Sequence, residues 1–533
     1  MRETVYFGGP ILTMEKEAPQ VEALLIRGGR IVCAGSREEA ERRAGAGGER
    51  IDLQGKTLLP AFIDPHSHIT ALASTIDLVP LASATCFDDI VARLCDYRDH
   101  TRLNAGDWIV GFGYDHNFLM EKRHPDRTVL DRVSTEHPVL ISHASGHMGV
   151  ANTAALRVGG CEGKVPDPEG GRFGRDAAGE PDGYLEENAF FQFSGGMPGP
   201  SPQTSVDRLL KAQDVYLSHG ITTIQDGKTD RAAFEQLLAV AQSGRLSADI
   251  VCYADLEKAP GLPEEQPACW KKYLNRLKLG GFKIFLDGSP QGETAWLTKP
   301  YEGRSDGYCG YPVHSYGEVR NLVSSVWERD AQLLAHCNGD AACEQFITAV
   351  EDVLTTSGRS DACRPVMIHA QTVRHDQLSR MARVGMIPSF FAAHVYHWGD
   401  VHLKNLGRAR ADRISPARAA QKRGMPYTFH QDTPVLPPDM LETVWCAVNR
   451  VTGEGVLLGE EERVSVQEAL EAVTIHAAYQ YFEEDRKGSL KEGKLADLVI
   501  LSANPLTVPP QDIKNIRVLE TVKEGETVYR HPL

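Results

Sequence analysis

Long apolar runs, an excess of basic charge and closely spaced cysteines are all missing from this sequence. No apolar run approaches the roughly 20 residues that a membrane-spanning helix needs, and the N-terminus lacks a charged segment followed by an apolar one. The 57 basic residues are outnumbered by 72 acidic residues, and the net charge of -15 argues against nucleic acid or an anionic membrane as a partner. We therefore expect a cytoplasmic protein that binds neither.

The 11 cysteines are scattered, and no two of them form a Cys-x-x-Cys pair. This spacing indicates neither a disulfide framework nor a zinc ribbon, so most of them are expected to be small buried hydrophobic residues. A chain of 533 residues is long enough for one large barrel with a smaller accessory domain, or for three ordinary domains. The order of the apolar runs along the chain decides between these arrangements.

Both ends of the chain are predicted to form short strands joined by tight turns. The strand-like runs are 21–27, 30–34, 495–501, 518–523 and 526–529. Gly28-Gly29 and Glu524-Gly525 separate two pairs of these runs, as the turn of a hairpin does. Neither end is long enough for a core of its own. We therefore predict that 1–57 and 485–533 together form one small β-sandwich.

Between the two ends, apolar runs alternate with longer amphipathic stretches, which is typical of a parallel α/β arrangement. Eight such runs can be counted: 58–68, 220–226, 248–253, 281–287, 332–336, 365–369, 386–391 and 425–432. Eight strands favour a closed (β/α)8 TIM-like barrel over an open sheet. The barrel is assigned to residues 58–484.

Residues from about 72 to 210 do not follow this repeat, because they are too many for a connection between a strand and a helix. They are rich in Gly and Pro from Gly159 to Pro202, and we predict a large insertion over the barrel mouth. Within it, His147 and Asn152 are placed either to reach a substrate carbonyl or amide, or to cap and bridge local turns.

Six side chains that suit a metal site lie at or near the ends of the apolar runs: His66, His68, Lys283, His336, His369 and Asp432. His66 and His68 are two residues apart, so on a strand they point to the same side and can reach one ion. The carboxyl ends of parallel barrel strands meet at the rim where barrel active sites form. Because four imidazoles and a carboxylate are good ligands for zinc, the set predicts a centre for zinc or a similar divalent ion.

Lys283 is the unusual member of this set. A buried ammonium beside two dications would be repelled, so the amine should lose its proton or point away. Carboxylation by carbon dioxide would remove the conflict, because the carbamate is anionic and has one oxygen for each metal. The alternative is an ordinary ammonium paired with a carboxylate such as Asp432. The residues alone favour the ion pair.

Several segments carry a resemblance to a known family. They are LLPAFIDPHSH, SGHMGVAN, FKIFLDGSPQGETAW, LLAHCNGDAA, IHAQTV, FHQDTPVLPPDM and VTIHAAYQYFEEDRKGSLKEGKLADLVILSANP. On these segments, from about residue 20 to the C-terminus, the chain resembles the amidohydrolase superfamily, in the branch that includes N-substituted formamide deformylases.

The resemblance implies a site with two divalent ions, expected to be zinc. His66 and His68 would bind one ion and His336 and His369 the other, with Lys283 as a bridging carbamate formed from carbon dioxide and Asp432 as ligand and proton shuttle. The sequence departs from many relatives at His430-Gln431-Asp432, where they have Gly-Ser-Asp. The aspartate is kept, so the departure concerns the identity of the substrate.

We therefore expect a hydrolase that cleaves a C–N amide-type bond, in an N-substituted formamide or a related small-molecule amide, by a metal-activated hydroxide. Asp432 would move the proton from water to the leaving amine, and His147 would help to hold the oxyanion.

Two alternatives stay open. One is a deaminase-like relative with one metal and a structural Lys283, and the other is a non-catalytic binding relative. Aromatic residues could line a pocket or be ordinary packing: Trp296, Phe390, Phe391, Tyr396 and Trp398. A homodimer is left open by the sequence.

Overall fold

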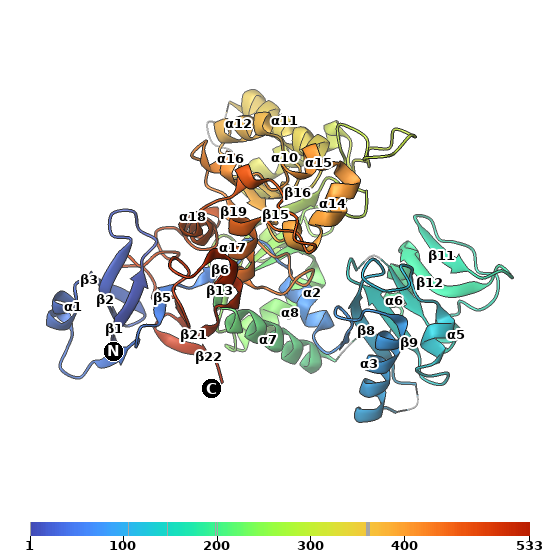
Figure 1. Ribbon diagram of the computed structural model, residues 1–533, viewed down its shortest axis with the longest axis horizontal. Helices are drawn as coiled ribbons and strands as arrows, with labels where there is room; N and C mark the ends of the chain where they lie inside the picture. Colours follow the sequence, from blue (N-terminus) through green and yellow to red (C-terminus); the bar gives the residue numbers. More distant parts are fainter. Residues whose placement is uncertain are drawn as a thin grey trace. The chain divides into compact units, whose positions relative to one another are not determined.

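The computed structural model describes residues 2–104, 106–146, 148–197, 199, 201–358 and 363–532 (Figure 1). The chain forms two compact units. The barrel unit comprises Met1–Leu72 and Leu209–Leu533, and the middle unit comprises Ala73–Arg208. No helix in the described ranges is both long enough and apolar enough to cross a membrane.

The centre of the barrel unit is a parallel sheet whose eight strands follow one another in sequence order. The strands are β6 (Phe62–Ile63), β13 (Ile221–Thr229), β14 (Asp249–Asp255), β15 (Leu277–Phe285), β16 (Gln332–Cys337), β17 (Val366–His369), β18 (Ile387–Phe390) and β19 (Thr428–Phe429). The sheet curls so that its first and last strands approach each other. His68 follows β6 and Thr433 follows β19, and the N–H of His68 donates to the carbonyl of Thr433 over 2.8 Å. This arrangement is TIM-barrel-like, and complete closure into a ring stays a prediction.

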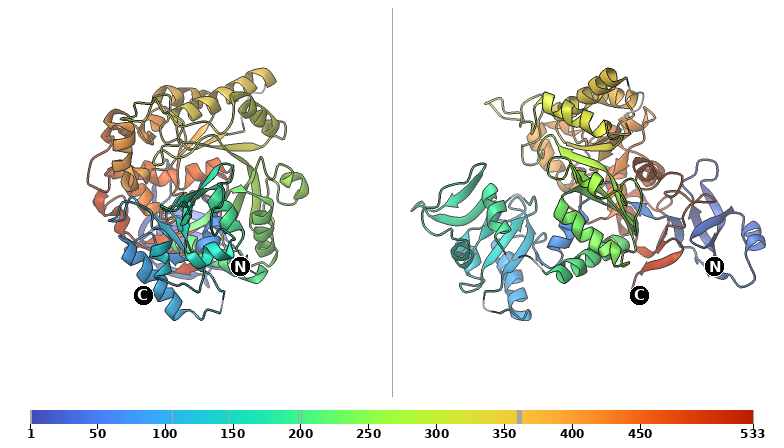
Figure 2. Two further views of the ribbon diagram at one scale, coloured as in Figure 1. Left: turned by 90° about the vertical axis from the view of Figure 1, so that its right-hand side faces the viewer. Right: turned by 180° about the vertical axis from the view of Figure 1, so that it is seen from behind.

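The apolar runs form these strands because a parallel sheet covered by helices is buried on both faces. All seven residues of β14 are buried. Helices α10 (Tyr316–Trp327) and α11 (Asp340–Ser357) pack against β16, on the outer side of the parallel strands in the views of Figure 2. A capping box of Ser315 and Glu318 starts α10, and Gly358 in a left-handed conformation ends α11.

A second sheet of the barrel unit joins the two ends of the chain. Its order is β22 (Glu526–Arg530), β21 (Val518–Lys523), β20 (Leu498–Leu501), β5 (Thr57–Pro60), β1 (Glu3–Leu12), β2 (Gln20–Arg27) and β3 (Arg30–Gly35), with β4 (Glu49–Asp52) paired to β1. Gly28 and Gly29, both with positive φ, form the predicted turn between β2 and β3. The two-layer sandwich and the boundaries at 57 and 485 stay predictions.

The prediction that residues 58–68 form one strand is wrong. The chain changes partners at Ala61: the strand before it, β5, pairs with β20, whereas Phe62 N donates to Gly220 O and starts β6. Strand β6 ends at Ile63, and the next residues are Asp64 and Pro65, which has no N–H to donate to a ladder. His66 and His68 therefore lie beyond a strand, and strand alternation does not orient them.

The middle unit has a six-stranded sheet and a core of its own. The strand order is β11 (Gly171–Arg175), β12 (Pro181–Glu187), β10 (Met148–Ala151), β9 (Val139–His143), β8 (Ile109–Tyr114) and β7 (Val79–Pro80). Strands β7, β8 and β9 are parallel, and α3 (Phe87–His100) packs its buried face on β7 and β8. The placement of this unit over a barrel mouth stays a prediction.

Candidate metal centre

The carboxyl ends of five barrel strands bring all six predicted metal-site residues into one cluster. His66 and His68 follow β6, Lys283 lies two residues before the end of β15, His336 is in β16, His369 ends β17, and Asp432 follows β19. Both His369 and Asp432 have positive φ, at 69° and 55°, a conformation that is uncommon for non-glycine residues. Such residues concentrate at functional sites, and here they carry two of the six side chains.

Three of these groups converge on one point. Asp432 Oδ1 lies 3.3 Å from Nε2 of His66 and 3.3 Å from Nε2 of His68. This carboxylate oxygen is buried and accepts no hydrogen bond within the described residues. Two imidazole nitrogens and a carboxylate oxygen this close together are able to hold a divalent metal ion.

The other two histidines face each other beside this group. His369 Nε2 lies 3.0 Å from His336 Nδ1 and 4.0 Å from Asp432 Oδ2. Ligand atoms on one tetrahedral ion, with bonds of about 2.0–2.1 Å, lie roughly 3.3 Å apart. The separation of the two nitrogens therefore suits a shared ion as well as a hydrogen bond.

Lys283 lies in the middle of the cluster, fully buried. Its Nζ is 3.2 Å from His66 Nε2, and it forms no ion pair with any residue that the structure describes. Burial lowers the pKa of this lysine to about 7. A large share of the side chain is therefore a neutral amine at neutral pH, and the alternative of an ion pair with Asp432 is absent from the described contacts.

The charge states of the remaining groups also suit a cation. Burial, reinforced by Lys283, lowers the pKa of His66 to about 4 and that of His336 to about 3. Burial opposes ionisation of Asp432, but the adjacent side chains of His66 and His68 hold its pKa well below the usual range. At neutral pH His66 and His336 are therefore neutral and Asp432 is charged, as metal ligands must be.

The model of the amidohydrolase family matches residues 49–529 of this sequence. The chain belongs to the amidohydrolase family. Its sequence is 26% identical to the N-substituted formamide deformylase of Arthrobacter pascens, over 99% of this chain and 98% of that protein. It is 27% identical to the protein LONG AFTER FAR-RED 3 of Arabidopsis thaliana, over 98% of this chain and 90% of that protein.

A solved structure is also similar to this amidohydrolase. The crystal structure of an uncharacterized metal-dependent hydrolase from Pyrococcus horikoshii OT3 matches with a TM-score of 0.79 and 26% identity. The match covers 95% of this chain and 99% of that one. Together with the curled parallel sheet, it confirms the predicted TIM-barrel-like fold.

Two residues whose positioning role the sequence did not predict contact the candidate ligands of this amidohydrolase. Gln225, on β13, accepts from His66 Nδ1 over 2.6 Å and donates to Pro65 O and Tyr481 Oη. This contact requires the proton of His66 on Nδ1 and leaves Nε2 free for a metal. His430 bridges Ser389 Oγ and His369 Nδ1, at 2.9 and 3.1 Å. Both residues lie in predicted strand runs, but no regular spacing in the sequence identifies them as residues that orient a ligand.

The candidate residues of the insertion have mixed outcomes. His147 lies outside the described residues. Asn152 caps α5 (Thr153–Val158): its Oδ1 accepts from the backbone N–H groups of Val139 and Ala155, and its Nδ2 donates to two carbonyls. All the hydrogen-bonding capacity of Asn152 is thus used locally, which favours the turn-capping role.

The predicted aromatic residues divide into two groups. The ring of Phe391 lies 6.1 Å from that of His369 and 5.2 Å from that of His430, and Trp398 packs on Phe391 at 6.1 Å. Tyr396 instead packs on Trp445, and Phe390 packs among the aromatic rings of the barrel. Among the described ring contacts of these four residues, that of Phe391 with His369 reaches a candidate ligand, and Trp398 packs behind Phe391.

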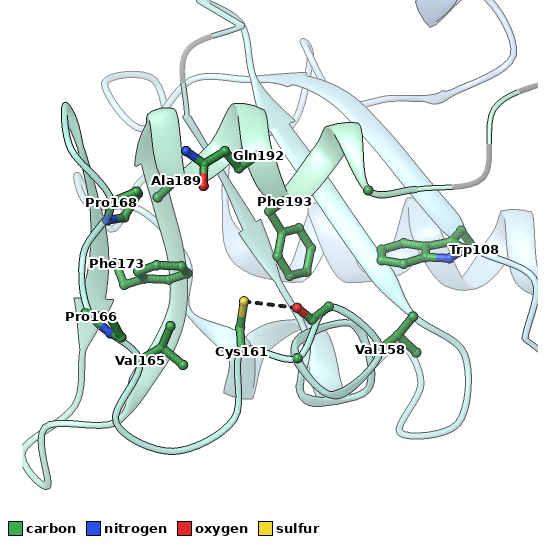
Figure 3. Close-up of a pocket in the computed structure, with 13 residues that line it drawn as sticks. Trp108, Val158, Cys161, Val165, Pro166, Pro168, Phe173, Ala189, Gln192 and Phe193 are labelled. Atoms are coloured by element: carbon green, nitrogen blue, oxygen red, sulfur yellow. Dashed lines mark hydrogen bonds between the residues drawn. The ribbon is translucent and has the colours of Figure 1, made fainter.

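An apolar pocket of about 360 Å³ lies in the middle unit, and its described lining includes none of the candidate ligands (Figure 3). Trp108, Phe173 and Phe193 line it, and the Cys161 thiol donates to Gly159 O at its floor. Burial raises the pKa of Cys161, which makes the thiol a poor nucleophile. The described lining has no carboxylate or imidazole, so this pocket offers no acid–base chemistry.

Proposed function

We propose that this amidohydrolase cleaves the C–N bond of an N-substituted formamide or a related small-molecule amide, with divalent metal as cofactor. The observation that carries the proposal is the convergence of four imidazoles, one carboxylate and one unpaired lysine at the carboxyl edge of the barrel. The similarity to a formamide deformylase over nearly the whole of both chains supports the reaction class.

The residues present fit a pair of divalent ions such as Zn²⁺. His66, His68 and Asp432 would hold one ion, His336 and His369 would hold the other, and Lys283 as a carbamate would serve both. When bound, such ions lower the pKa of water and polarise a carbonyl.

Carboxylation of Lys283 requires its neutral amine. The nitrogen lone pair forms an N–C bond to carbon dioxide, and the nitrogen then loses a proton to give the anion. The low pKa of Lys283 and the absence of an ion pair within the described residues both support this step. Burial disfavours an isolated anion, but the carbamate would lie between two cations. Carboxylation would therefore replace a buried amine without an ion pair by an anion with oppositely charged neighbours.

Asp432 is placed to move the proton. Its carboxylate is ionised and faces the shared centre of the cluster, so it is able to accept a proton from attacking water and pass it to the leaving amine. The leaving nitrogen of an amide departs poorly without protonation. Gln225 holds the ring of His66 in the orientation that this geometry needs.

Replacement of Asp432 by Asn tests the proposal. Turnover of N-formyl, N-acyl and cyclic amides by the zinc-loaded Asp432→Asn variant should fall at least about 100-fold, since general acid–base catalysis contributes 10²–10⁴-fold. Most of the bound metal should remain, measured by mass spectrometry of the metals. The exposed Asp512→Asn serves as the matched control. A fully active Asp432→Asn variant would refute the proton-transfer role.

Metal content separates this proposal from its alternatives. A centre with two ions and a carboxylated lysine should retain about two equivalents of zinc and lose metal when expressed without bicarbonate. A deaminase-like centre would hold one ion whatever the bicarbonate supply, and a non-catalytic relative would bind metal without turnover of any amide in the panel.

A further inference from the structure

A second group of metal-ligand side chains lies in the middle unit, on residues that the barrel centre does not use. Asp115 and His116 directly follow β8, and His143 is the last residue of β9. The two strands are parallel, with Tyr114 opposite His143, so their carboxyl ends meet at one edge of the sheet (Figure 1). This is the same structural position that carries the ligands in the barrel unit.

The distances in this group suit a metal ion better than hydrogen bonds. His116 Nδ1 lies 3.3 Å from His143 Nε2, Asp115 Oδ1 lies 3.4 Å from His143 Nε2, and Asp115 Oδ1 lies 3.7 Å from His116 Nδ1. Hydrogen bonds between such atoms are usually about 2.9 Å long. Ligand atoms around a tetrahedral ion with bonds of about 2.0–2.1 Å lie roughly 3.3 Å apart.

Hydrogen bonds within the triangle would all be long. Each of the three mutual contacts exceeds the usual hydrogen-bond length, whichever imidazole nitrogen carries the proton. A cation at the centre of the triangle contacts all three atoms at once. The side chains of Asp115, His116 and His143 are 12%, 30% and 9% exposed, so the ion would also be reachable from solvent.

Neighbouring groups hold the three ligands in place. Asn117 donates to Asp115 Oδ1 from its backbone and its side chain, at 2.8 and 3.0 Å. The ring of His124 packs on that of His116 at a tilt of 32°, with the ring centroids 4.0 Å apart, while its Nδ1 contacts Tyr114 Oη at 3.0 Å. Hydrogen bonds and packing of this kind orient metal ligands in known sites.

We propose that Asp115, His116 and His143 form a binding site for a first-row divalent ion of the zinc class, distinct from the barrel centre. Two imidazoles and one carboxylate match the ligand type of such ions, and three protein ligands leave one position for water or another small ligand. The ion links the end of β8 to the end of β9. Metal binding therefore stabilises the middle unit, whether or not the barrel centre is loaded.

Zinc titration of the full chain tests this site. The chain is stripped with a chelator and titrated with Zn²⁺ alone in a background in which His66→Ala and His336→Ala weaken the barrel centre. We expect one equivalent to bind, and His116→Ala and His143→Ala should raise its Kd more than about 100-fold, because even groups that only orient ligands contribute 10–100-fold. The exposed His100→Ala, in the same unit, should leave the Kd unchanged.

A second readout keeps the test decisive if an alanine variant folds poorly. Asp115→Asn keeps the size of the side chain and should weaken Zn²⁺ binding with little loss of folding, judged by circular dichroism. Co²⁺ in place of Zn²⁺ should give the absorption bands of a tetrahedral or five-coordinate site, and His143→Ala should remove them. Equal zinc content in the parent and in Asp115→Asn, His116→Ala and His143→Ala, or binding only at millimolar zinc, overturns the proposal. Neither result depends on amide turnover.

Discussion

The amino and carboxyl ends of the barrel strands, here called the amino edge and the carboxyl edge, use buried charge in opposite ways. Strand β15 shows the difference within nine residues. Lys278, near its start, is buried and pairs with Glu483. Lys283, near its end, is buried without an ion pair among the described residues and lies against the imidazole of His66. Two lysines on one strand thus have contrasting partners.

The amino edge is a network of paired ions. Lys487 Nζ lies 2.6 Å from Asp249 Oδ2 and 2.8 Å from Glu483 Oε2. Lys523 Nζ lies 2.8 Å from the same Asp249 oxygen and 2.7 Å from Asp497 Oδ2. Each of these buried charges has a partner of opposite sign, so the network ties the terminal segments to the barrel and leaves none of these described groups free for chemistry.

The comparison shows how the role of a buried lysine depends on its partner. Where a carboxylate is in contact, as Glu483 is with Lys278, its charge opposes the effect of burial on the ammonium, and removal of the lysine leaves an unpaired anion. Where no ion pair forms among the described residues, burial destabilises the ammonium and lowers the pKa of Lys283 to about 7, so the neutral amine becomes available for reaction. The following predictions test this difference at both edges.

The largest effect is expected for Lys283→Ala at the carboxyl edge. The rate constant kcat should fall at least about 10³-fold, because metal contributes several kcal/mol to the stabilisation of a transition state. The free energy of unfolding of the metal-free chain should stay the same or rise, since an unpaired buried amine is removed. Steady-state kinetics and urea unfolding measure the two quantities. A large loss of stability together with retained activity would show that Lys283 has a structural role and no catalytic one.

Lys487→Met at the amino edge should give the opposite result. Asp249 and Glu483 would each lose a cation, and breaking a buried ion pair from one side costs about 3–5 kcal/mol. Urea unfolding of the variant should show this loss, while kcat per folded, metal-loaded molecule should change little. An unfolding curve identical to that of the parent would show that Lys278 and Lys523 are enough to stabilise Glu483 and Asp249.

The ion pairs of the amino edge should also make the free energy of unfolding depend on pH, with a smaller effect than the substitutions above. Burial alone would raise the pKa of Glu483, but Lys487 and Lys278 lower it to about 2. A depressed carboxyl pKa contributes stability that is fully present above the unfolded value of about 4.3 and is lost as the pH falls towards 2. This residue should account for on the order of 3 kcal/mol of that loss.

Urea unfolding of the metal-free chain at pH 5, 4 and 3 measures this dependence, and the absence of metal excludes loss of ligands by protonation. Glu483→Gln should have a shallower slope over the same interval. Equal slopes for the parent and Glu483→Gln would show that the carboxyl is not depressed in the folded chain.

The main parts of the fold could be predicted because each depends on local pattern. The near-continuous apolar runs that become β13 to β18 and the Gly28-Gly29 turn are visible in the sequence, since burial on both faces and positive φ each restrict residue type. Residues 58–68 mislead the same reasoning. An apolar run has the same appearance whether one sheet or two sheets bury it, so the change of partner at Ala61 has no local signature.

The candidate site divides in a similar way. The six ligand types at the ends of runs were found because histidine, aspartate and lysine are rarely buried without a reason. Gln225 and His430 were missed because a residue that orients a ligand needs only one well-placed hydrogen bond, which any polar residue on a neighbouring strand can supply. The group of Asp115, His116 and His143 was missed because His143 lies 27 residues after His116 and all three belong to a part of the chain without a repeat.

The sequence by itself determined the strand-forming runs, their order and the chemistry of the residues at their ends, because these depend on side-chain type and short-range periodicity. Only the tertiary structure decided which charges meet. The sequence places Lys283 in a predicted run and Lys278 just before it, but the contacts with Glu483 and His66 come from segments about 200 residues away in each case. A pKa depends on burial and on charges within a few ångströms, and those distances exist only in the folded chain.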